Sequence, residues 1–181
     1  MKNIIIFSML ITNLFLSAYA QNKVKSDLKK PATTIQNIML SVIDPNIDFV
    51  WNSVATVNTA QGTEERRPKT NKDWKEVKQH ALAVFEGSKQ LLLKDTKVAD
   101  ANANTSSHPV ELSAADIQKT IDAHRSDYAK RVEALQHALK LTIAAIDAKN
   151  VDELEKAGGI VDQACEQCHT QFWYPNDKRP K

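Results

Sequence analysis

Two thiols and an imidazole lie close together near the C-terminal end of the chain. Cys165 and Cys168 are the only two cysteines, and His169 follows directly in the stretch DQACEQCHTQF. On a helix, residues three and four positions apart lie on one face. Both thiols can therefore form thioethers with one flat ligand, and the imidazole beside them can bind its iron, as in the C-x-x-C-H motif. The sequence predicts one haem c group with His169 as proximal iron ligand.

Other interpretations of the cysteine pair agree less well with the rest of the sequence. A structural zinc site normally has four protein ligands, and there is no second cysteine pair. A thioredoxin-like redox pair is expected near a βαβ pattern, which we do not find. A structural disulfide, typical of exported proteins, explains the two cysteines but leaves His169 without a role. A disulfide-bonded protein without haem therefore remains the third alternative interpretation of the cysteine pair.

The first 20 residues, MKNIIIFSMLITNLFLSAYA, have the pattern of a cleaved secretory signal peptide. Lys2 precedes an apolar run that is too short to span a bilayer, and Ala18-Tyr19-Ala20 has the small-x-small pattern of a cleavage site. We therefore expect export to the periplasm of a Gram-negative bacterium, with no membrane span after cleavage. Polar residues 21–32 are expected to form a flexible arm before one domain at 33–181.

Composition and periodicity predict an all-α fold. The 181 residues include only four glycines, and their formal net charge of +2 is spread evenly, which gives no indication of nucleic-acid binding. Apolar residues at helical spacing predict four helices, with Thr33 or Thr34, Ser113 and Asn150 as N-caps: 34–59, 71–94, 113–149 and 150–172. Pro45 is expected to kink the first of them or to make it restart with Asp44 as a new cap. Residues 60–72 and 95–112 are expected loops. The simplest packing is an antiparallel up-down-up-down four-helix bundle.

Met39 is the predicted distal ligand of the iron. It is the only methionine after residue 20. In such a bundle the start of the first helix is level with the end of the last. At 1.5 Å per residue, Met39 lies about 7.5 Å from one end and His169 about 6 Å from the other. A methionine that only packs over the haem is the alternative, and it would leave a five-coordinate iron.

The turn near residues 149–150 places residue 131 opposite Cys168 in the antiparallel neighbour. The predicted haem wall is therefore Tyr128, Arg131, Val132 and Leu135. His124 lies about two turns away, and we expect it to be a polar core residue or a contact of the haem edge rather than a ligand.

Several stretches resemble periplasmic monohaem cytochromes of the cytochrome c-prime superfamily: IMLSVIDPNIDFVW, RPKTNKDWKEVKQHALAVFEGSKQLL and GGIVDQACEQCHTQF. The resemblance implies a four-helix bundle, and dimers through the first helix are common in the superfamily, so a homodimer is a possible assembly. Low-spin members use a methionine in this part of the first helix, whereas gas-binding members have an apolar residue there. No catalytic nucleophile or acid–base pair stands out. We therefore expect single-electron transfer to a redox partner protein rather than an enzyme, with nitric oxide or carbon monoxide binding as the alternative.

Overall fold

The computed structural model describes residues 34–103, 105 and 108–178. The expected signal peptide (1–20) and arm (21–32) lie outside the described residues. The described chain is mostly helical, with one small hairpin. Its elements are α2 (Ile35–Ile38), the π-helical segment η1 (Met39–Ile43), α3 (Asp44–Asn52), β1 (Thr56–Thr59), β2 (Gly62–Glu65), α4 (Asn71–Leu91), α5 (Ala114–Ala123), α6 (Arg125–Asp147) and α7 (Val151–Phe172).

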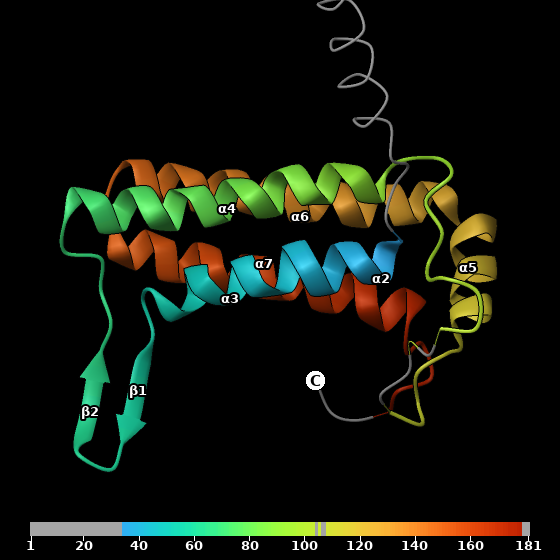
Figure 1. Ribbon diagram of the computed structural model, residues 1–181, viewed down its shortest axis with the longest axis horizontal. Coiled ribbons are helices and arrows are strands. Elements are labelled where there is room, and N and C mark those ends of the chain that lie inside the picture. Colours follow the sequence, from blue (N-terminus) through green and yellow to red (C-terminus); the bar gives the residue numbers. More distant parts are fainter. Residues whose placement is uncertain (1–33, 104, 106–107, 179–181) are drawn as a thin grey trace, which may run out of the picture. The chain divides into compact units, whose positions relative to one another are not determined.

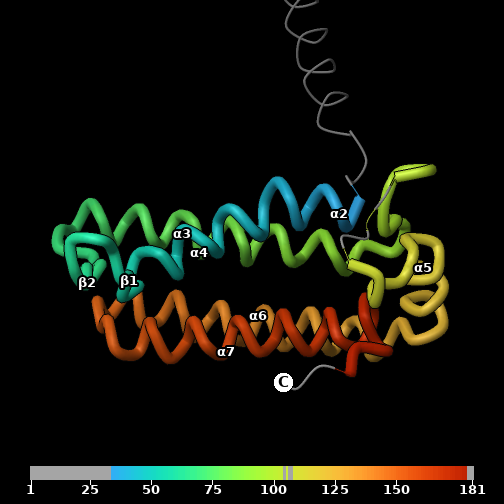
Figure 2. Tube along the Cα trace, turned by 90° about the horizontal axis from the view of Figure 1, so that it is seen from below, coloured from blue at the N-terminus to red at the C-terminus, as the bar shows by residue number. Residues whose placement is uncertain are grey.

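The long helices lie side by side, and successive ones run in opposite directions (Figures 1 and 2). Helix α6 packs along both α7 and α4, and α3 packs on α4 and α7. The apolar faces of the helices meet in one core, which contains residues of every α-helix. In the part of the chain that the structure describes, no helix is both long and apolar enough to cross a membrane.

Side-chain caps fix where these helices begin. Each N-cap side chain accepts a hydrogen bond from the backbone N–H three residues further on, at Thr34, Thr70, Ser113 and Asn150. Such a cap satisfies one of the N–H groups that the first helical turn leaves unpaired. The expected caps Thr34, Ser113 and Asn150 are thereby confirmed.

The first helix continues through Pro45 without the new cap that the sequence suggested. Asp44 does not cap α3. Its backbone N–H instead donates to the carbonyl of Met39, which is the i→i−5 bond of a π-helix. A widened turn directly before Pro45 gives its ring room where an α-helical carbonyl would clash. Of the two expectations at Pro45, the restart capped by Asp44 was wrong, because one π turn absorbs the interruption.

The same helix ends earlier than predicted, and part of the expected loop forms a hairpin. Helix α3 ends at Asn52, and β1 pairs antiparallel with β2, from Thr56 opposite Glu65 to Thr59 opposite Gly62. Gly62 has a φ of 123°, which only glycine adopts readily. β-Branched residues in β1 and a glycine at the turn favour the hairpin over further helix.

The predicted helix 113–149 is broken at His124. This residue has φ −125° and ψ 40°, so α5 ends there and α6 starts anew. His124 is exposed, which makes its predicted core position wrong. The break contains no proline or glycine, and the buried residues on either side, Ile121 and Tyr128, keep helical spacing. The periodicity therefore gives no sign of the break.

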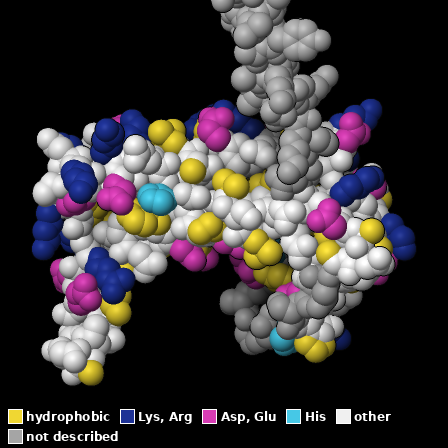
Figure 3. All heavy atoms as spheres, in the orientation of Figure 1, with side chains coloured by type: hydrophobic (Ala, Val, Ile, Leu, Met, Phe, Trp, Pro, Cys, Tyr) yellow, Lys and Arg dark blue, Asp and Glu magenta, His cyan; other side chains and the backbone are white. Residues whose placement is uncertain are grey.

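Basic and acidic side chains are interspersed on the face shown in Figure 3, with apolar side chains between them. The described salt bridges are mostly between exposed partners, such as Lys78 with Asp147 at 2.6 Å. Exposed pairs of this kind contribute little to stability. The packing of the apolar helix faces is therefore the main source of the stability that positions the site.

Candidate functional site

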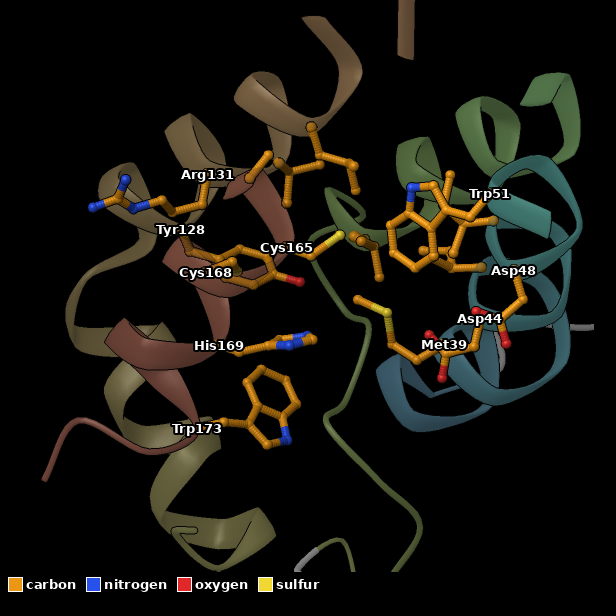
Figure 4. A pocket seen from close by; sticks show the side chains of 16 residues that line it. Met39, Asp44, Asp48, Trp51, Tyr128, Arg131, Cys165, Cys168, His169 and Trp173 are labelled. Carbon is orange, nitrogen blue, oxygen red and sulfur yellow. The ribbon is translucent and has the colours of Figure 1, made fainter. Parts of the chain in front are cut away.

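A cavity of about 270 Å³ lies between the N-terminal helical segment and the pair α6–α7. Figure 4 shows its walls: η1 and α3 on one side, α6 and α7 on the other. The lining is mainly apolar and includes all four residues predicted to bind the cofactor, Met39, Cys165, Cys168 and His169. Residues from opposite ends of the chain therefore meet at one place.

Helix α7 supplies the two thiols and the imidazole. It runs unbroken through Cys165, Cys168 and His169, so the three side chains share the face that lines the cavity (Figure 4). Both cysteines are free. Burial raises the pKa of Cys165 to about 11 and that of Cys168 to about 12. The thiols therefore stay protonated at neutral pH, and neither is a ready thiolate for redox exchange.

The environment of His169 favours its neutral form. Burial lowers the pKa of the imidazole, and the carboxylates of Asp44, Glu166 and Glu111 oppose this shift without reversing it. A neutral imidazole keeps a lone pair, which is what a metal requires of histidine. Among the described residues, no group of three or more His, Cys, Asp or Glu side chains comes together as a metal site.

Met39 faces His169 across the cavity. It is the first residue of η1, it is partly buried, and its sulfur points into the cavity in Figure 4. The thioether also borders a second cavity of about 210 Å³, which shares Met39, Asp44, His169 and Trp173 with the first. Met39 is therefore part of the boundary between two spaces.

Helix α6 forms the opposite wall. Tyr128, Arg131, Val132 and Leu135 all line the cavity, as the antiparallel register predicted. Arg131 is held at its edge by two side chains of α7, because its Nε donates to Gln171 Oε1 at 2.7 Å and its Nη1 to Gln167 Oε1 at 2.9 Å. The break at His124 lies before these four residues and leaves their register with α7 unchanged.

The sequence reasoning missed two carboxylates at the rim. Asp44 and Asp48, one turn apart on α3, both line the cavity (Figure 4). Partial burial raises the pKa of Asp44, the charge of His169 opposes this, and the charge of Asp48 adds to it. Asp44 and Asp48 follow Met39 by five and nine residues, a spacing that does not share one face in a regular α-helix, and the π turn of η1 changes this register. Residue spacing therefore carried no signal for them.

Trp51 is the aromatic link between α3 and α7. Its Nε1 donates to the carbonyl of Gly158 at 3.3 Å, and its indole lines the cavity. A Cβ at position 158 would lie 3.2 Å from Trp51 Cδ1, so the close approach of the ring depends on glycine.

Comparisons of the chain with protein-family models, with curated proteins and with solved structures found no match. The residues themselves nevertheless fit a haem group. Two thiols lie on one helix face, a neutral imidazole adjoins them, a thioether faces them, and the space between is lined by apolar side chains. The hydroxyl of Tyr128, buried in the same wall, also has no hydrogen-bond partner among the described residues.

Proposed function

We propose that this protein is an exported c-type cytochrome that transfers single electrons. Cys165 and Cys168 would hold one haem through two thioethers, and His169 and Met39 would bind its iron. The observation that carries the proposal is the convergence of these four side chains on one cavity from two separate parts of the chain. When bound, the haem iron supplies one-electron redox chemistry.

The residues of the chain would have distinct roles. The paired thiols fix the group to α7, and the neutral imidazole of His169 offers a nitrogen to the iron. Met39 would complete the coordination from η1, which raises the reduction potential and keeps other ligands out. Buried apolar side chains such as Ile43, Ile47 and Val132 keep water from the site.

We further propose an up-down-up-down four-helix bundle of the cytochrome c-prime kind, built from α2–α3, α4, α6 and α7. The packing contacts among these helices and the quoted sequence stretches support this architecture. The same resemblance supports a periplasmic location and a redox protein as partner. Export also agrees with covalent attachment, because c-type haem is attached to exported chains.

A second candidate function, binding of nitric oxide or carbon monoxide to a five-coordinate haem, has one specific observation in its favour. Met39 borders the second cavity as well as the first. Its flexible side chain therefore has space to turn away from the iron without entering the packed core. In that case Met39 would be a lid over the gas-binding position.

Visible spectra distinguish the two functions. The wild type and Met39→Leu, which keeps the volume and removes the sulfur, are expressed with haem-attachment machinery and examined oxidised, reduced and with carbon monoxide. Electron transfer requires a sharp low-spin reduced spectrum that carbon monoxide does not change, and a high-spin spectrum for Met39→Leu. A high-spin wild type that binds carbon monoxide, with an unchanged Met39→Leu, supports gas binding. Colour lost on acid-acetone extraction would refute both.

A further inference from the structure

Tyr128 carries a buried hydroxyl that nothing in the described chain satisfies. The residue is 1 % exposed, and its Oη has no hydrogen-bond partner among the described residues. Its ring packs edge-on against Phe172, with centroids 5.5 Å apart and an interplanar angle of 85°. Burying an unpaired hydroxyl costs free energy, and nearly all buried polar groups in proteins have a partner. The partner is therefore to be sought in the group that occupies the cavity.

The hydroxyl points toward that group. Tyr128 lines the cavity, and in Figure 4 its oxygen points from α6 into the space beside Cys168 and His169. Burial raises the pKa of the phenol further above neutrality. Tyr128 therefore keeps its proton and offers a hydrogen-bond donor rather than a negative charge.

The charges around the cavity are divided between its two sides. The acidic side chains of Asp44, Asp162 and Glu166 lie near Cys165. The cationic Arg131 lies near Cys168, one turn along α6 from Tyr128. A carboxylate in the cavity is therefore repelled from the side of Cys165 and attracted toward Cys168, where the charge of Arg131 acts.

We propose that Tyr128 is a positioning residue that donates a hydrogen bond to a carboxylate of the bound group, namely a haem propionate. Arg131 lies one turn further along α6, where Gln167 and Gln171 hold its guanidinium outside the cavity, and its charge contributes only at longer range (Figure 4). This inference rests on the proposed function, because the propionates are the carboxylates that haem contributes. Tyr128 would thereby fix which edge of the haem faces α6.

The test compares Tyr128→Phe with the wild type in the haem-loaded protein and in the unloaded chain kept reduced. In the loaded protein, losing a hydrogen bond to a charged acceptor lowers the folding equilibrium constant about tenfold. In the unloaded chain the substitution removes an unpaired hydroxyl, so stability stays the same or rises. The matched control is Tyr174→Phe, since the Tyr174 hydroxyl already bonds Glu166 Oε2 at 2.7 Å and should have the same effect in both forms.

Resonance Raman spectra of the loaded proteins provide the second readout, which also serves if the unloaded chain does not fold. The propionate bending band should shift in Tyr128→Phe and stay in place in Tyr174→Phe. An unmoved band, or equal stability effects with and without haem, overturns the role of Tyr128 alone. A chain that takes up no covalent haem overturns the proposed function and this inference with it.

Discussion

Gly158 and Gly159 are adjacent in α7, yet alanine should have opposite consequences at the two positions. A Cβ at Gly158 would lie 3.2 Å from Cδ1 and 3.4 Å from Nε1 of Trp51, whereas a Cβ at Gly159 meets nothing within 4 Å. Gly158 is buried and Gly159 is exposed. The same substitution on the same helix therefore separates intrinsic helix propensity from the packing of Trp51.

The magnitudes follow from these two environments. Replacing glycine by alanine inside a helix stabilises it by about 0.8–1 kcal/mol, so Gly159→Ala should gain about that much. Gly158→Ala gains the same propensity. It also requires the indole to shift by a few tenths of an ångström, which strains the hydrogen bond from Trp51 to the Gly158 carbonyl. Overpacking of this kind costs about 1–3 kcal/mol, so the net change at Gly158 is between about zero and 2 kcal/mol of destabilisation.

Urea denaturation followed by far-ultraviolet circular dichroism measures both variants against the wild type. The two free energies of unfolding should differ by at least about 1 kcal/mol, with Gly159→Ala the more stable. Tryptophan emission should change in Gly158→Ala alone, because only that variant moves Trp51. Equal stabilisation by both substitutions, with unchanged emission, would refute the close contact between α3 and α7 at this point.

Two further predictions concern the ends of helices α4 and α7. Hydrogen bonds from the backbone of Lys69 and Thr70 lower the pKa of Asp73, so its carboxylate stabilises the fold fully above its unfolded pKa of about 4 and progressively less as the pH falls through the lower folded value. Asp73→Asn should therefore reduce stability at pH 7, and urea midpoints should show the difference from wild type shrinking toward pH 2. Phe172→Ala should cost about 3–5 kcal/mol, because the ring is 0 % exposed, while the control Ile160→Ala, at a residue 42 % exposed, should stay within about 0.5 kcal/mol by the same assay.

The parts of the fold that the sequence predicted well have local causes. Thr34, Ser113 and Asn150 cap their helices through hydrogen bonds that span three residues, so the residue types alone indicate them. Cys165, Cys168 and His169 share a face because α7 is one continuous helix. The wall that contains Arg131 was predicted correctly because α7 runs antiparallel to α6 after a short turn. Each of these features depends on a single helix or a single connection between helices.

The features that the sequence did not predict arise where two local structures compete for the same residues. The hairpin after α3 forms where β-branched residues and Gly62 outweigh a weak helical pattern. The break at His124 interrupts a stripe of buried residues that continues across it, so only the packing of α5 at the end of α6 and α7 reveals it. Asp44 and Asp48 are four residues apart, a spacing that occurs on the exposed face of a helix as well as at the rim of a cavity. Hydrophobic periodicity alone does not distinguish these structures from the ones that were expected.

The predicted positions of Met39 and His169 were unaffected because no unpredicted feature lies between either residue and the N-cap of its helix. Met39 follows Thr34 through one α-helical turn, and the π turn begins only at Met39 itself. Asn150 starts α7, which is unbroken as far as His169. The hairpin lies at the end of the helices away from α5 (Figure 1), and the break at His124 comes before the wall. The position of a residue along the helix axis depends on the number of residues from the start of the helix. The segments from Thr34 to Met39 and from Asn150 to His169 therefore determine that these two side chains meet at the same position along the helices.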